Sequence, residues 1–116
     1  MEKYKQGKVF EDMAVDHLKN SGYKILERNF QTRYGEIDII AEKDNQIIIV
    51  EVRGKKNTYF GKPEETISRS KIRRILKTTQ IYIKSKNLHN RQIRFDIISI
   101  VDNNIFHIKN AFDVDF

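Results

Sequence analysis

Apolar and polar residues alternate in two neighbouring segments near the middle of the chain. Residues 35–43 and 46–53 are rich in isoleucine and valine, and the polar pair Asp44-Asn45 separates them. β-Branched residues at every second position, on both sides of a two-residue polar connection, are typical of a β-hairpin. The pattern therefore predicts two antiparallel strands with Asp44 and Asn45 at the centre of the turn.

The register of this hairpin places charged residues opposite one another. With the turn centred on 44–45, Asp38 faces Glu51 and Glu36 faces Arg53. Facing Cβ atoms in an antiparallel ladder are about 4.5–5.5 Å apart, and like charges at this distance are destabilising. Because carboxylate oxygens are the ligands that Mg²⁺ prefers, the pair predicts a divalent cation shared by Asp38 and Glu51. Solvated charges at the end of a partly exposed sheet are the alternative interpretation.

The two faces of the hairpin differ in polarity. One face is apolar along its whole length and consists of Ile37, Ile39, Ala41, Ile48, Val50 and Val52. The opposite face is apolar in its middle, and Glu36, Asp38, Glu51 and Arg53 make its open end charged. A hairpin at the surface would be polar along one entire face. The pattern thus favours central strands that are covered on both sides, with a polar site at one end.

Helical periodicity predicts one helix on each side of the hairpin in the sequence. The first covers residues 4–21 and ends at Gly22, and its apolar stripe contains Phe10, Met13, Ala14, His17 and Leu18. Glu11 lies at the edge of that stripe, where it either approaches the sheet or is solvated. The second helix begins near Glu64 or Ser70 and ends at Lys86, and its buried stripe contains Ile72, Ile75, Leu76, Thr79, Tyr82 and Ile83.

Three further strands complete the predicted fold, at residues 23–30, 92–101 and 105–109. The order is helix, three strands, helix, two strands. Because a helix connects the third strand to the fourth, we expect those two strands to be parallel within a mixed sheet that carries helices on both faces. Gly35 is expected to give the chain a positive φ before Glu36, and Asp96 to pair with a nearby arginine or lysine.

Composition fits a soluble globular protein with a single domain over residues 1–116. Of its residues, 39% are hydrophobic and 33% are charged, and there is no cysteine. The absence of cysteine excludes disulfides, thiolate zinc sites and cysteine nucleophiles, and is compatible with a reducing cytoplasm. No apolar run approaches the roughly 20 residues of a membrane span, so we expect a cytoplasmic protein without a membrane partner. A homodimer is compatible with the sequence.

Net charge indicates the kind of partner. The chain carries a formal charge of +6, and the second helix contributes Arg69, Lys71, Arg73 and Arg74 without an acidic residue among them. Exposed helices usually mix both signs, so this face and the loop residues Lys55 and Lys56 predict contacts with the phosphates of DNA or RNA. A solvated face, or one that docks an acidic protein, are the alternatives.

Several motifs together resemble a known family. They are Gly7, Glu11 and Ala14; Gly22-Tyr23, Leu26 and Arg28-Asn29; residues 35–41; residues 50–53; Phe60-Gly61, Pro63-Glu64, Lys71 and Arg74; and Arg94-Phe95-Asp96. These resemble the YraN-like family of bacterial proteins, which is assigned to the restriction-endonuclease-like PD-(D/E)xK superfamily. The resemblance implies a three-layer α/β/α fold similar to Holliday-junction resolvases and an endonuclease that uses Mg²⁺ or Mn²⁺. The site it implies consists of Glu11, Asp38, Glu51 and the residue at position 53.

Position 53 departs from the family pattern, which usually has lysine where this chain has Arg53. Arginine stays protonated and is planar, so the exchange is not conservative beside a metal-bound water. We expect a nucleic-acid-binding protein and a metal-dependent endonuclease with Asp38 and Glu51 as ligands. The alternative is a non-catalytic nucleic-acid-binding module with a degenerate site. Lys55 is a candidate to replace the missing lysine.

Overall fold

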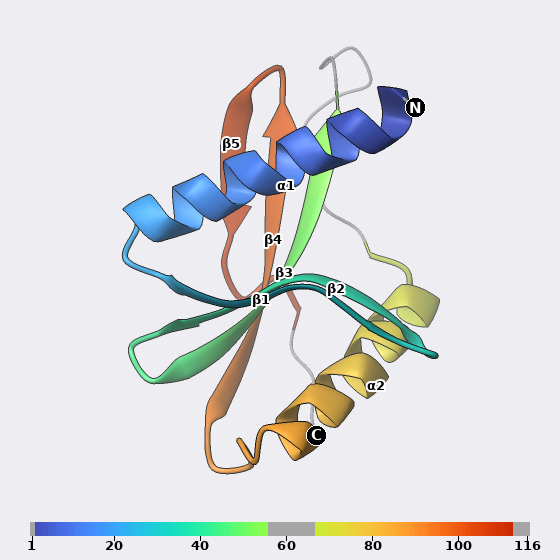
Figure 1. The fold of residues 1–116 in the computed structure, drawn as a ribbon, viewed down its shortest axis with the longest axis vertical. Helices are drawn as coiled ribbons and strands as arrows, with labels where there is room; N and C mark the ends of the chain where they lie inside the picture. Colours follow the sequence, from blue (N-terminus) through green and yellow to red (C-terminus); the bar gives the residue numbers. More distant parts are fainter. Residues whose placement is uncertain (1, 56–66, 113–116) are drawn as a thin grey trace.

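The predicted order of elements is confirmed. The computed structural model describes residues 2–55 and 67–112 and contains α1 (Glu2–Asn20), β1 (Lys24–Thr32), β2 (Gly35–Lys43), β3 (Gln46–Lys55), α2 (Arg69–Ser85), β4 (Gln92–Val101) and β5 (Asn104–Ile108). Figure 1 shows α1 crossing the strands on one side of the sheet and α2 lying along it on the other. Gly22 ends the first helical segment with a φ of +87°, as its position after α1 predicts.

The five strands form one mixed sheet in the order β1-β2-β3-β4-β5. β3 and β4 are parallel, and the other neighbouring pairs are antiparallel. The parallel pair confirms the expectation, because a helix is long enough to carry the chain back to the start of the neighbouring strand. The helix that connects β3 to β4 is α2.

Each face of the sheet has its own apolar core. The core beneath α1 contains Ala14, Val15 and Leu18 of the helix with Ile39, Ala41, Ile48, Val50, Ile98 and Ile100 of the strands. The core beneath α2 contains Ile75 and Tyr82 of the helix with Ile37, Ile40, Ile47, Ile49 and Phe95 of the strands. Burial on both faces confirms the prediction that β2 and β3 are central strands of a layered α/β fold.

The β2–β3 hairpin has the predicted turn and register. Asp44 and Asn45 have φ values of 51° and 65°, which is the left-handed pair that a two-residue hairpin turn requires. The ladder runs from the pair at the turn to Ile39 opposite Val50 and ends there. Beyond that point β2 stays paired with β1, while β3 continues beside β4, so the two strands separate (Figure 1). The predicted pairings of Asp38 with Glu51 and of Glu36 with Arg53 lie beyond this ladder.

Two local expectations on β2 are wrong. Ile37 packs in the core beneath α2 rather than with Ile39 beneath α1. The neighbouring strand explains the change, because Asn29 has a φ of 54° and interrupts the β1–β2 pairing just before Phe30 meets Ile37. Gly35 does not have the expected positive φ. Its small size serves packing instead, since a Cβ there would lie 3.2 Å from the Cβ of Arg74 in α2.

Asp96 is the centre of a buried polar network, as its expected pairing with a cation predicts. Arg94 donates to both carboxylate oxygens at 2.9 and 2.8 Å, and the Asn110 N–H donates at 3.0 Å. His107 Nε2 lies 2.8 Å from Oδ2 and its Nδ1 lies 3.1 Å from Nε2 of His17. Burial opposes the charge of Asp96, but the bonds from His107, Arg94 and Asn110 outweigh it and lower the pKa of this carboxyl. The network links β4, β5 and α1.

Candidate metal and nucleic-acid site

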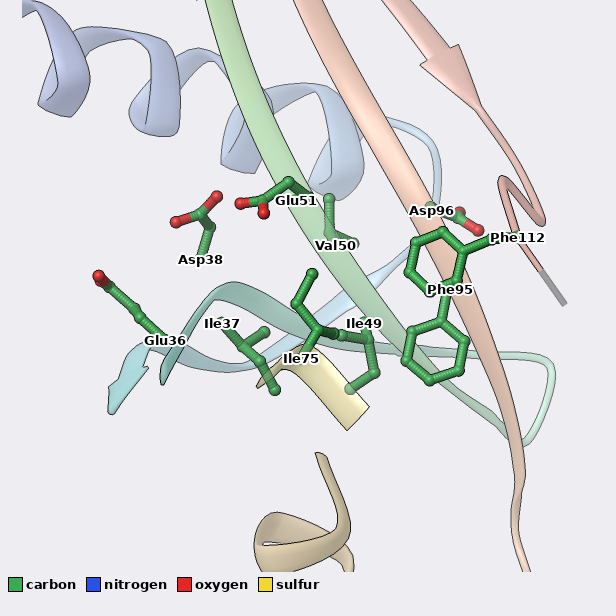
Figure 2. A pocket seen from close by; sticks show the side chains of 10 residues that line it. All are labelled: Glu36, Ile37, Asp38, Ile49, Val50, Glu51, Ile75, Phe95, Asp96 and Phe112. Carbon is green, nitrogen blue, oxygen red and sulfur yellow. The ribbon is translucent and has the colours of Figure 1, made fainter. Parts of the chain in front are cut away.

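Two carboxylates come together at the point where β2 and β3 separate. Figure 2 shows the side chains of Asp38 and Glu51 pointing toward the same space from the two strands. The Val52 N–H donates to Oδ2 of Asp38 at 2.8 Å. This side-chain hydrogen bond connects β2 to β3 just beyond the last backbone pair of the ladder. Glu51 is only 9% exposed. The structure thus brings together the two residues that the sequence placed at the centre of the site.

The environment of Asp38 strongly favours its neutral form. Burial, a hydrogen bond with Glu51 and the charge of that carboxylate raise the pKa of Asp38 to about 9, although the Val52 N–H works in the opposite direction. Two carboxylates that share a small volume cannot both be ionised at low cost, so one of them retains a proton. A divalent cation removes that conflict, because it attracts both charges. Burial is the largest cause of the raised pKa of Asp38, and the neighbouring Glu51 carboxylate adds to it.

Glu51 offers a second indication that a cation fits here. Its Oε2 is buried and has no aligned hydrogen-bond donor among the described residues, although Lys71 Nζ lies 2.9 Å away as an ion-pair partner. A buried carboxylate oxygen without a hydrogen bond is costly, and hard divalent ions bind such oxygens. Within residues 2–55 and 67–112 no group of three or more His, Asp or Glu is arranged as a metal site. The donors present are a pair, and Mg²⁺ and Mn²⁺ commonly take one or two carboxylates together with water.

Glu11 lines a groove that Asp38 also lines. A cavity of about 1120 Å³ is lined by residues of α1, β1, β2 and β3, including Glu11, Asp38 and Glu36. Oε1 of Glu11 accepts hydrogen bonds from Arg28 Nε at 2.8 Å and from Asn29 Nδ2 at 3.0 Å. The side chain therefore faces the groove at a fixed place, held by β1.

The side of the carboxylate pair that faces α2 is tightly packed. A void of only about 10 Å³ lies there, between the carboxylates and the side chains of Ile37, Ile49, Ile75, Phe95 and Phe112 (Figure 2). The Phe95 and Phe112 rings stack with their centroids 5.0 Å apart. This apolar floor excludes water beneath the carboxylates and fixes their positions, which is the condition for a preorganised ion site.

The predicted cationic residues that the structure describes lie on β3 and α2. Arg53 is half-buried on β3, two residues after Glu51, and Lys71 projects from the first turn of α2. Arg69, Arg73 and Arg74 are exposed on α2, which has no acidic residue in its sequence. Lys56 lies outside the described residues, and so does the side chain of Lys55. Among the described cations of α2, Lys71 is the one with an ion pair to the carboxylate pair, through Glu51.

Two contacts of the site were not predicted from the sequence. The first is the clamp that Arg28 and Asn29 form on Glu11, and the second is the reach of Lys71 to Glu51. Arg28-Asn29 was part of the family resemblance, and that was the signal available for the clamp. The contact of Lys71 had no local signal, since it joins residues 20 positions apart through the packing of α2 on the sheet.

Comparison with known proteins places these residues in a family context. The family described as "Uncharacterised protein family UPF0102" matches residues 10–100. A "UPF0102 protein" of Persephonella marina is 60% identical over 111 residues, which cover 96% of each chain. One of a Sulfurihydrogenibium strain is 47% identical over 115 residues, 99% of this chain and 100% of the relative. These matches confirm the resemblance to the YraN-like family.

A match to a solved structure is of low similarity. "Crystal structure of SSO0001" matches 95% of this chain and 52% of that chain at 15% identity, with a TM-score of 0.46. A similarity of this size bears on neither fold nor function. In the described part of the chain no helix is long and apolar enough to cross a membrane.

Proposed function

The chain belongs to the uncharacterised protein family UPF0102, and we propose that it is a nucleic-acid-binding protein and a metal-dependent endonuclease that hydrolyses phosphodiester bonds in branched DNA or in RNA. The observation that carries the proposal is the pair of Asp38 and Glu51. Their carboxylates lie together where two strands separate, with the pKa of Asp38 raised to about 9. The basic face of α2 begins beside them.

Each part of the site has a role in this proposal. Asp38 and Glu51 would hold Mg²⁺ or Mn²⁺, and the ion would supply an activated water and a positive charge at the scissile phosphate. Glu11 orients a water at the opposite wall of the groove, and the Arg28 clamp keeps it there. Arg53 holds a phosphate oxygen through its planar fork. Arg69, Arg73 and Arg74 contact the phosphate backbone along α2, together with Lys55 and Lys56. A nucleic-acid substrate is consistent with a cytoplasmic protein.

A non-catalytic binding module is the second candidate, and Arg53 is the observation that favours it. A lysine ammonium is a compact charge with three donors and fits against a metal-bound water, whereas a guanidinium is wider and better suited to gripping a phosphate. In such a module the ion would help to hold a phosphate without cleaving it. The carboxylate pair and the raised pKa of Asp38 support the first candidate, because binding alone does not require two acids at one point.

Metal binding is tested first, by titrating Mn²⁺ and Mg²⁺ into wild type, Asp38→Asn and Glu51→Gln in a calorimeter. An ion that binds only the folded protein stabilises it by about 2.7 kcal/mol at 100 times its Kd. We expect binding and a rise in Tm for wild type, and neither for the two variants. An unchanged Tm in millimolar Mn²⁺ would exclude the proposed site.

Cleavage then separates the two candidates. Labelled branched, duplex and single-stranded substrates are incubated with wild type, Arg53→Lys and the double variant Arg53→Lys with Glu51→Gln. The nuclease proposal expects Mn²⁺-dependent cleavage that the Glu51→Gln change abolishes, with activity equal or higher in Arg53→Lys. Binding without cleavage in every variant would favour the non-catalytic module. Cleavage that survives in the double variant would come from another site or a contaminant.

A further inference from the structure

We propose that Lys71 is a catalytic residue of this site, a counter-ion that holds Glu51 in the metal-free protein and turns to the scissile phosphate when Glu51 takes up a metal ion. This inference rests on the nuclease function proposed above. It adds a residue from α2 to a site whose other members come from α1, β2 and β3.

The first observation is the placement of the ammonium. Lys71 Nζ lies 2.9 Å from Oε2 of Glu51, and this oxygen has no aligned hydrogen-bond donor among the described residues. The contact is thus a charge pair without the directional bond that would lock it. The Lys71 side chain is 41% exposed, whereas that of Glu51 is 10% exposed. The exposed ammonium gains little from such a pair, whereas the buried Glu51 carboxylate needs another cation in its place if Lys71 leaves.

The second observation is that the backbone of Lys71 is held firmly while its side chain is not. Ser68 caps α2 by accepting a hydrogen bond from the Lys71 N–H at 3.1 Å. Along the same helix, Thr78 Oγ1 lies 3.0 Å from Thr32 Oγ1, and Gly35 packs closely against Arg74. These contacts fix α2 against the β1–β2 turn. The four rotatable bonds of Lys71 therefore carry the ammonium over a small arc around one fixed origin.

The third observation is the position of that arc. Lys71 is the residue of α2 that contacts the carboxylate pair, while Arg69, Arg73 and Arg74 on the same helix are exposed to solvent. A nucleic acid bound to α2 would therefore meet an ammonium that already contacts the carboxylate pair.

Charge balance determines when Lys71 moves. Without an ion, its ammonium is the positive charge that compensates Glu51. When Glu51 becomes a metal ligand, the like charges of the ion and the ammonium repel, and Lys71 turns toward the phosphate. In hydrolysis the water oxygen bonds to phosphorus and one ester P–O bond breaks, leaving its electron pair on the departing oxygen. Of the two water protons, one ends on that oxygen and the other passes to solvent. Lys71 stabilises the extra negative charge on the phosphate oxygens during this step.

The test compares Lys71→Ala and Lys71→Met with Lys84→Ala. Lys84 is an exposed lysine of the same helix, outside the proposed machinery, so its loss removes the same charge. Lys71→Met keeps the aliphatic stem if Lys71→Ala destabilises the fold. Mn²⁺ affinity is measured by calorimetry, duplex and branched DNA binding by anisotropy, and single-turnover cleavage at saturating Mn²⁺.

Both Lys71 variants are expected to bind Mn²⁺ about two- to fivefold more tightly than Lys84→Ala, because the competing ammonium is gone. They should cleave at least about 100-fold more slowly, while their DNA affinity matches that of Lys84→Ala. Equal Mn²⁺ affinity, or equal cleavage rates, would overturn the role of Lys71 and leave the nuclease proposal intact. A wild type that binds no Mn²⁺, or that binds Mn²⁺ and DNA without cleaving, would overturn the nuclease proposal and the role of Lys71 with it.

Discussion

Binding of a divalent ion at Asp38 should release a proton. The pKa of Asp38 is raised to about 9, so about 1% of this carboxyl is ionised near pH 7. An ion that binds the Asp38 carboxylate must displace the proton that this carboxyl carries near pH 7. Binding should therefore release about one proton per ion. The apparent Kd should consequently fall about tenfold for each pH unit between about pH 6 and pH 8, which corresponds to 1.36 kcal/mol per unit.

The metal-free protein provides the matching stability measurement. The pKa of Asp38 lies above its value of 3.8 in an unfolded chain, so the folded state binds this proton more tightly. The stability that the proton contributes is complete below about pH 4 and is lost as pH rises toward about 9. Wild type should therefore lose stability to urea as pH rises through this window, whereas Asp38→Asn should not show this loss.

The assay is calorimetric titration of Mn²⁺ near pH 7 in several buffers with different enthalpies of ionisation. The slope of the observed enthalpy against the buffer enthalpy gives the number of protons released, and Asp38→Asn serves as the control. A slope near zero in wild type, with a Kd that does not change between about pH 6 and pH 8, would refute the reasoning. It would mean that Asp38 is already ionised or is not a ligand.

Four other substitutions test the fold and the basic surface. Asp96→Asn should lower the free energy of unfolding in urea by about 3 kcal/mol, because it leaves the Arg94 guanidinium of a buried network without its anion. Gly54→Ala should destabilise the protein by about 1–3 kcal/mol, since the new Cβ would lie 2.0 Å from the ring of Phe10. The matched change Gly7→Ala meets no neighbour within 4 Å and should stabilise α1 by up to about 1 kcal/mol. Arg73→Ala should weaken duplex binding for all sequences alike and lower the slope of log K against log salt by about one.

Local sequence determined the elements and their order. Alternation of apolar residues defined β2 and β3, and the pair Asp44-Asn45 fixed the turn and hence the register as far as Ile39 and Val50. The helix between the third and fourth strands determined that β3 and β4 are parallel. These features depend on periodicity and turn chemistry, which act over a few residues. Asp38 and Glu51 were found because both lie close to that register.

The tertiary structure decided what happens where the hairpin ends. The separation of β2 from β3, the face on which Ile37 packs and the close approach of Gly35 to Arg74 all follow from pairing and packing with β1, β4 and α2. The contact of Lys71 with Glu51 and the clamp of Arg28 on Glu11 arise in the same way. Each of these contacts joins segments that are far apart in the sequence. A local sequence pattern does not indicate which distant segments will meet in the fold. The positions of the acids could be read from the strands, but their charge environment could not, because it is set by the residues that the fold brings around them.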